Sequence, residues 1–134
     1  MSGKIVLAVS ALMFLGFGIA FLLAPAELGA LVQLKADNPV ARTELRAFYG
    51  GMEIGLALFQ MCCVFKAAWT APGLLVAGLA FGCTAGARIF GLIVDQSTNN
   101  TMLMILVVEV IFAVAAFVAL AKTRPQEKVA TVKS

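Results

Sequence analysis

Four apolar stretches separated by short polar segments dominate this sequence, and three of them contain isolated charged residues. Hydrophobic residues make up 62% of the chain and charged residues 13%, and the mean hydropathy is +1.01. Soluble globular domains carry about 25% charged residues. About 20 apolar residues in a helix cross a hydrocarbon core of about 30 Å. The sequence therefore predicts an all-α integral membrane protein, a four-transmembrane-helix up-down bundle.

The four spans are predicted at about 5–23, 43–65, 73–94 and 102–121, so that residues 1–121 form one transmembrane domain. The first apolar run resembles a signal peptide, because Ala24-Pro25-Ala26 looks like a cleavage site. It exceeds the usual 7–15 apolar residues, however, and we expect it to be retained. Residues 122–134 form a polar basic tail with no reason to fold alone.

Basic residues predict the orientation of the bundle. One predicted side carries Lys4, Lys66, Lys122, Arg124, Lys128 and Lys133, and the other carries Lys35, Arg42 and Arg46. Cytoplasmic loops of membrane proteins carry the excess of Lys and Arg. Both termini are therefore expected in the cytoplasm.

Glu53, Arg88 and Glu109 lie inside three separate spans. Each such charge costs roughly 2.5–3.5 kcal/mol at mid-membrane on an insertion scale, so these residues should face a partner or a cavity and not lipid. Helical rise places all three at similar depth in the outer half of the membrane. We therefore expect a Glu53-Arg88-Glu109 cluster. It is either structural glue between helices or a polar pocket for an ion, a proton or a lipid headgroup.

A second pair of charges extends this cluster outward. Arg46 precedes Glu53 by seven residues and Asp95 follows Arg88 by seven, which places each pair on one helical face. Arg46 and Asp95 are thus expected near the outer surface as a second rung. Tyr49 lies one turn before Glu53 and either donates to a carboxylate or headgroup or serves as an interfacial anchor.

Glycines at helical spacing predict close helix packing. The glycines in question are Gly50, Gly51, Gly55, Gly78, Gly82, Gly86 and Gly91. Gly50 and Gly91 lie on the charged faces. Gly78, Gly82 and Gly86 form a separate stripe, which is expected to meet the first span or another subunit, with packing inside the chain preferred.

Catalytic chemistry has no candidate residues in this sequence. The chain has no His, and Cys62, Cys63 and Cys83 show no CxxC spacing. No nucleophile stands beside a base, and no phosphate-binding loop is present. We expect no enzyme, no metal, no cofactor and no nucleic-acid partner.

Two segments carry a family resemblance. Glu44-Leu45-Arg46-Ala47-Phe48-Tyr49-Gly50-Gly51-Met52-Glu53-Ile54-Gly55-Leu56, followed by Ala87-Arg88-Ile89-Phe90-Gly91-Leu92 and Asp95, resembles domain of unknown function 4345. This is a family of small four-span bacterial membrane proteins, loosely similar to the DoxX-like group. The resemblance implies a four-helix fold in the bacterial inner membrane and no particular activity. Gln96 stands where that pattern has glycine, so the outer turn is expected to differ.

Three functions remain open from the sequence. The preferred one is an accessory or assembly subunit that packs against a larger membrane complex through the glycine stripe. The second is a small oligomeric transporter or channel that uses Glu53 and Glu109. The third is a lipid- or quinone-binding helper of a redox enzyme, with Arg46, Tyr49 and Arg88 facing a headgroup. The expected partners are membrane lipid and another membrane protein or a second copy of the chain.

Overall fold

A computed structural model describes the backbone of residues 3–132 and the side chains of residues 3–123. Its described elements are all helical: α1 (Gly3–Leu23), α2 (Pro25–Leu31), α3 (Pro39–Leu45), η1 (Arg46–Gly51), α4 (Met52–Phe65), η2 (Ala67–Trp69), α5 (Thr70–Asp95) and α6 (Asn100–Val132). Four segments are long and apolar enough to cross a membrane: Gly3–Leu23, Pro39–Phe65, Ala67–Asp95 and Asn100–Thr123. Each predicted span lies inside one of them, which supports the all-helical fold class.

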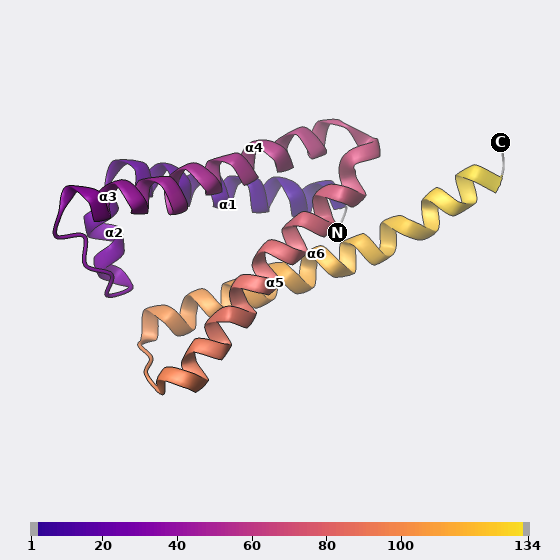
Figure 1. Ribbon diagram of the computed structural model, residues 1–134. Coiled ribbons are helices and arrows are strands. Elements are labelled where there is room, and N and C mark those ends of the chain that lie inside the picture. Colours follow the sequence, from indigo (N-terminus) through magenta and orange to yellow (C-terminus); the bar gives the residue numbers. More distant parts are fainter. Residues whose placement is uncertain (1–2, 133–134) are drawn as a thin grey trace.

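The chain folds as two antiparallel hairpins (Figure 1). The first hairpin pairs α1 with the continuous α3, η1 and α4, and the second pairs α5 with α6. α1 also contacts both helices of the second hairpin. The two hairpins meet near the start of α1 and the start of α5, and they diverge toward their other ends. We call these the joined end and the open end.

Local signals in the sequence explain where several helices begin and stop. Pro25 and Pro39 stand in the first turns of α2 and α3, where a missing N–H costs nothing. Asn38 and Asn99 cap α3 and α6 by accepting hydrogen bonds from Ala41 N at 2.9 Å and from Met102 N at 2.8 Å.

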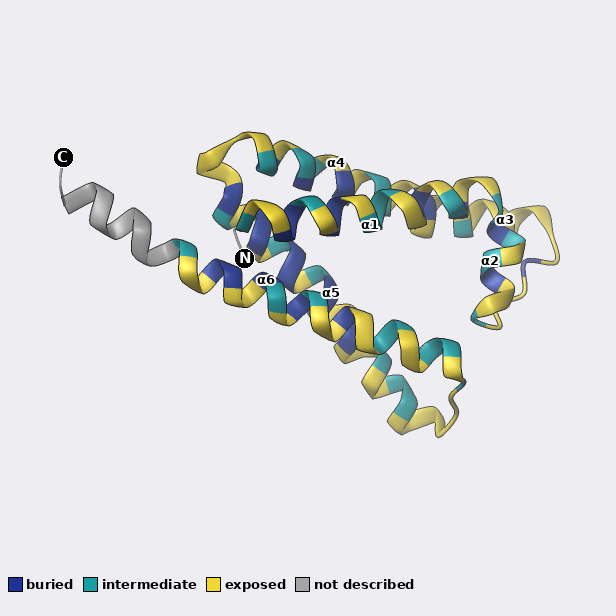
Figure 2. Cartoon of the chain, turned by 180° about the vertical axis from the view of Figure 1, so that it is seen from behind, coloured by how far each residue is buried: buried dark blue, intermediate teal, exposed yellow. Residues whose placement is uncertain are grey.

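The hydrophobic core lies at the joined end, where all four long helices contribute. It contains Val6, Leu7, Cys63, Leu74, Ala77, Ala116, Ala119 and Leu120. Phe81 of α5 stacks on Phe14 of α1 at 4.7 Å and on Phe112 of α6 at 5.0 Å between ring centroids. This aromatic stack joins the hairpins on the side of the core toward the open end. Figure 2 shows exposed and intermediate residues in α5 and α6 toward the open end.

The glycine stripe of α5 packs against α6, so the prediction that it meets the first span or another subunit is wrong at its best-packed position. A Cβ added at Gly78 would lie 2.9 Å from the ring of Phe117. A Cβ at Gly82 would have its nearest neighbours, Phe117 and Ala113, at 3.8 and 3.9 Å. A Cβ at Gly86 would meet nothing within 4 Å. The stripe therefore serves packing inside the chain at one end and is open at the other.

Close packing of the first hairpin depends on Gly18, a glycine of the first span. A Cβ on Gly18 of α1 would lie 2.9 Å from the Gly50 carbonyl oxygen and 2.7 Å from Ile54 Cγ1. Gly50 itself approaches Leu22, to which an added Cβ would lie 2.9 Å. Gly55 has open space, and Gly51 and Gly91 approach only residues of their own segment. Among the predicted packing glycines, Gly50 and Gly78 are thus the ones in tight contact with another helix.

The backbone of 122–132 continues α6 as a helix, although its composition predicted a tail with no reason to fold alone. Pro125 lies in this continuation.

Candidate functional site

Arg88 of α5 and Glu109 of α6 form a two-bond ion pair inside the second hairpin. Arg88 Nη2 donates to Glu109 Oε1 at 2.7 Å, and Nε donates to Oε2 at 3.0 Å. The two side chains are 21% and 9% exposed. It is the one ion pair within 4 Å among the described side chains of residues 3–123. Two parallel charge-assisted bonds fix both the position and the plane of the guanidinium.

Glu53 does not join this pair, so the predicted three-residue cluster is formed only in part. Glu53 lies on α4 in the first hairpin, and its Oε2 is buried with no hydrogen-bond partner among the described residues. The hairpins have already diverged at this distance from the joined end (Figure 1). The prediction assumed that all four helices pack side by side, whereas α1 pairs mainly with α4 and α5 pairs mainly with α6.

The inner faces of the two hairpins can be followed from the aromatic stack. Phe14 and Phe81 touch across the hairpins. Phe21 follows Phe14 by seven residues on α1, and Arg88 follows Phe81 by seven residues on α5. Seven residues are two helical turns, or about 10 Å, so Phe21 lies on the same face as Phe14 and Arg88 on the same face as Phe81. Phe21 stacks on Tyr49 with a centroid distance of 4.9 Å. Tyr49 and Arg88 therefore lie on opposite walls of the opening at similar height above the stack.

The second predicted rung, between Arg46 and Asp95, is also not formed. Arg46 Nε donates to the carbonyl oxygen of Leu22 at 3.0 Å, which ties the outer end of α1 to η1. Asp95 is exposed at the end of α5 and carries no ion pair within 4 Å in the described structure. Its Oδ2 lies 3.8 Å from the place where a Cβ of Gly91 would stand, so the carboxylate folds back along its helix.

The backbone of the Arg-Ala-Phe-Tyr-Gly-Gly segment is π-helical, which the sequence interpretation did not predict. This turn, η1, interrupts the α-helix between α3 and α4 and contains Arg46, Tyr49 and Gly50. The N–H of Met52 accordingly bonds to the Ala47 carbonyl five residues back. Single π-helical turns occur frequently at functional sites. The only sequence signal was the adjacent Gly50-Gly51 pair, which is a poor helix former.

A pocket of about 410 Å³ opens beside Arg88, and we call it the Arg88 pocket. It is lined by Thr84, Ala87, Arg88, Gly91, Leu92, Asp95, Ser97 and Met102. Thr84, Arg88, Gly91 and Asp95 repeat at helical spacing on the α5 face that includes Phe81. The pocket is thus on the inner face of the second hairpin, toward the open end.

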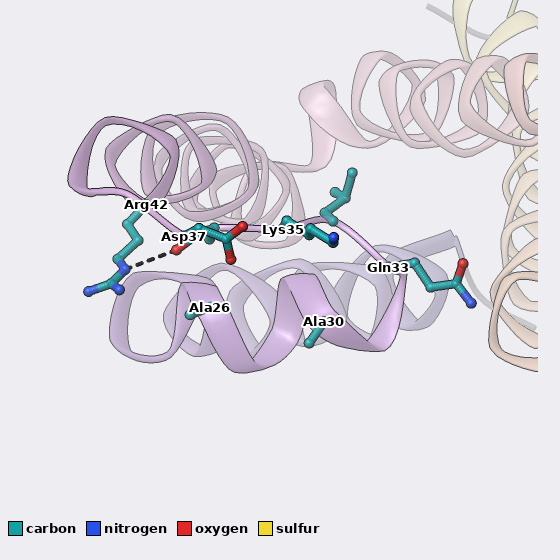
Figure 3. A pocket seen from close by; sticks show the side chains of 8 residues that line it. Ala26, Ala30, Gln33, Lys35, Asp37 and Arg42 are labelled. Atoms are coloured by element: carbon teal, nitrogen blue, oxygen red, sulfur yellow. Dashed lines mark hydrogen bonds between the residues drawn. The ribbon is translucent and has the colours of Figure 1, made fainter.

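A second pocket, of about 730 Å³, lies between α2 and the chain that leads into α3 (Figure 3). Lys35, Asp37 and Arg42 line it together with Ala26, Ala30, Gln33, Leu34 and Ala36. Arg42 Nε donates to the Ala36 carbonyl at 3.1 Å, which closes the loop over α2. The charged side chains of this second pocket are exposed, and none of the predicted site residues lines the pocket.

Two polar residues missed by the sequence interpretation are buried in the joined half of the bundle. Gln60 of α4 is 0% exposed and Ser10 of α1 is 1% exposed. The Gln60 amide and the Ser10 hydroxyl have no hydrogen-bond partner among the described residues. Since Gly18 lies opposite Gly50 and Ile54 in the antiparallel pair, Ser10 lies opposite Gln60 in the same register. Gln60, seven residues after Glu53, could have been recognised as a second polar residue on that face.

The arrangement can bind a polar group but offers no catalytic constellation among the described residues. Among these residues, no group of three His, Cys, Asp or Glu side chains is placed to hold a metal ion. Arg88 has five N–H donors and uses two on Glu109. The remaining donors and the Asp95 carboxylate are the charged groups that the Arg88 pocket offers to a ligand, and Thr84 and Ser97 add hydroxyl groups.

Comparison with known proteins gives one family. The family model described as Domain of unknown function (DUF4345) matches residues 2–120. This range includes the first three apolar segments, the fourth up to residue 120, η1, Arg88 and Glu109. Neither the comparison with curated proteins nor the comparison with solved structures gives a match.

Proposed function

The chain belongs to the family Domain of unknown function (DUF4345), and from the geometry of its own site we propose that it binds the polar end of an amphipathic membrane molecule, a lipid or a quinone, in the Arg88 pocket. The protein acts in this proposal as a multi-pass membrane protein that holds or presents such a molecule. It performs no chemistry on it.

The proposal depends on one observation: Glu109 holds the Arg88 guanidinium in place, and several N–H donors of that guanidinium remain free. Glu109 takes Nε and one Nη2 hydrogen, which leaves the Nη1 hydrogens and the second Nη2 hydrogen. The side chain remains 21% exposed beside a pocket. A charge placed among apolar helices normally faces a partner or a functional cavity. A phosphate or carbonyl oxygen of a bound molecule is the partner that fits the remaining donors.

The surroundings of the Arg88 pocket suit an amphipathic molecule. Leu92 and Met102 supply apolar walls, and the inner face of the first hairpin presents the stacked rings of Phe21 and Tyr49. Large apolar side chains such as Phe90 and Ile93, both 68% exposed, cover the neighbouring surface of α5. An apolar tail would find contacts outside the pocket while its polar end sits at Arg88.

The proposed location is the cell membrane, in bacteria the inner membrane, with both termini in the cytoplasm. The excess of Lys and Arg on the side of the joined end supports this orientation. The Arg88 pocket then lies in the outer half of the bilayer, near the level at which headgroups begin.

An accessory or assembly subunit is the second candidate. The tightest point of the glycine stripe, Gly78, is already covered by Phe117, which removes part of the surface on which a partner helix would pack. Gly55 and Gly86 have open space in front of them and would be the contact points. Transport through buried carboxylates ranks third. Arg88 engages both oxygens of Glu109, and among the described residues Glu53 is the one carboxylate with a buried oxygen that has no partner.

The test is purification in native membrane discs followed by mass spectrometry of the retained small molecules and proteins. The informative variant is the double substitution Arg88→Gln with Glu109→Gln, which removes the ion pair without leaving a buried unpaired charge. Lys35→Gln changes a charge in the other pocket and is the control. We expect a specific amphiphile in the wild-type protein and the control and its loss in the double variant. Equal retention in all three would reject the proposal, and a stoichiometric protein partner would favour the accessory role.

A further inference from the structure

The charges around the Arg88 pocket are unequal. Arg88 contributes +1, while Asp95 in the pocket wall and Glu109 bonded to Arg88 contribute −1 each, so the sum is −1. A purely anionic headgroup would satisfy the free N–H donors of Arg88 but would meet uncompensated negative charge nearby. A ligand with an additional cationic group would add no net negative charge, and its cation would face the uncompensated carboxylate.

The two ends of the pocket differ in chemistry. Arg88 and Asp95 stand on one face of α5, seven residues and about 10 Å apart along the axis. Gly91 lies between them without a side chain, and the Asp95 carboxylate folds back toward that gap, with Oδ2 at 3.8 Å from the Cβ position of Gly91. The long arginine side chain and the folded carboxylate thus present a donor end and an acceptor end to one small group. The volume of about 410 Å³ falls in the usual range for small-molecule sites, about 300–1,000 Å³.

From these observations, and resting on the proposed function, we propose that the headgroup bound in the Arg88 pocket is an amine-bearing phosphate, of the phosphoethanolamine type. Its phosphate oxygen accepts from the free N–H groups of Arg88, and its ammonium donates to the carboxylate of Asp95. Both contacts are charge-assisted hydrogen bonds. Ser97, two residues after Asp95 in the chain, also lines the pocket.

Phosphatidylethanolamine and phosphatidylglycerol distinguish this chemistry, because the two headgroups share the phosphate and differ in the amine. The protein is reconstituted in discs that contain both lipids in equal amounts, and the retained lipid is measured by native mass spectrometry. We expect the wild-type protein to retain the amine-bearing lipid in preference, and Asp95→Asn to reduce that preference roughly tenfold, the effect of losing one charge-assisted bond. Asp37→Asn, which removes an acidic group from the other pocket, is the matched control and should keep the preference.

The outcomes separate the two proposals. Retention of both lipids without preference, or a preference that Asp95→Asn leaves unchanged, overturns the amine-bearing headgroup while lipid binding in the pocket stands. Retention that also survives the Arg88→Gln, Glu109→Gln double substitution overturns both. If neither lipid is retained, the amine-bearing headgroup and lipid binding are overturned, and the quinone alternative of the proposed function stands. Soluble phosphoethanolamine added at millimolar concentration tests the source of the headgroup: displacement of the lipid identifies the free compound as a ligand, and no displacement assigns the site to the intact lipid.

Discussion

The carboxylate of Glu109 accepts two hydrogen bonds from the guanidinium of Arg88, one from Nε and one from Nη2, across the α5–α6 hairpin. Glu109 is the more buried partner, with a side chain 9% exposed. The pair joins two helices that also touch through Gly78 and Phe117 and through Phe81 and Phe112. It therefore belongs to the structure of one hairpin and at the same time forms the edge of the Arg88 pocket.

Removing one partner of this pair should lower the free energy of unfolding more than neutralising both charges. Arg88→Ala leaves the Glu109 carboxylate buried without its donor, and breaking a buried pair in this way costs about 3–5 kcal/mol. The Arg88→Gln, Glu109→Gln double variant leaves no such charge and should lose clearly less. Unfolding in mixed detergent, followed by circular dichroism, measures both. Equal losses would show that an unpaired Glu109 carboxylate carries no extra cost at this position.

Gly78 and Gly86 should respond oppositely to added side-chain atoms. Gly78→Ala places a Cβ 2.9 Å from the Phe117 ring, and overpacking of this kind costs about 1–3 kcal/mol. Gly86→Ala meets open space and should be neutral or stabilise its helix by up to about 1 kcal/mol. Thermal unfolding of the two variants under one condition gives the comparison. A destabilised Gly86→Ala would instead indicate that a second molecule packs at that position.

Gln60→Leu should stabilise the protein. The amide is 0% exposed and has no partner among the described residues, and an unsatisfied buried polar group costs about 1–3 kcal/mol. Leucine keeps much of the volume and removes that cost, whereas Gln60→Ala leaves a cavity and should destabilise. The two midpoints in a denaturant titration decide the matter. A less stable Gln60→Leu would mean that the amide is hydrogen-bonded in the membrane.

Gln96→Gly should stabilise the turn between α5 and α6. Gln96 ends α5 in the left-handed region with φ 47° and ψ 34°. A residue with a Cβ pays roughly 1–2 kcal/mol in this conformation, which glycine avoids. We expect a net gain of up to about 1 kcal/mol in the free energy of unfolding, because glycine also gives the unfolded chain more freedom. Thermal unfolding of the variant and the wild-type protein measures this gain.

Asn99→Ala removes the hydrogen bond that caps α6 at Met102 N. It should lower the free energy of unfolding by about 1 kcal/mol, measured by thermal unfolding in the same way.

Much of this fold was predictable from local sequence properties. Hydropathy identified four helices, and the prolines and short polar segments marked where they are connected. The Gln96 position illustrates the same point at one residue. The family resemblance implies glycine there, and the backbone at Gln96 is left-handed, the conformation that glycine adopts most easily.

The sequence by itself determined the number of long apolar helices, their approximate ends and the position of each charged residue along its helix, because apolar length and helical rise depend only on neighbouring residues. The tertiary structure decided which charges meet. Arg88 pairs with Glu109 inside one hairpin, Glu53 remains on the opposite wall, and Gly78 meets Phe117 of α6. Lateral contacts depend on how the aromatic stack and the small residues of all four helices fit together at the joined end. The resulting divergence of the hairpins, which no single helix encodes, separates Glu53 from Arg88 and leaves the pocket open.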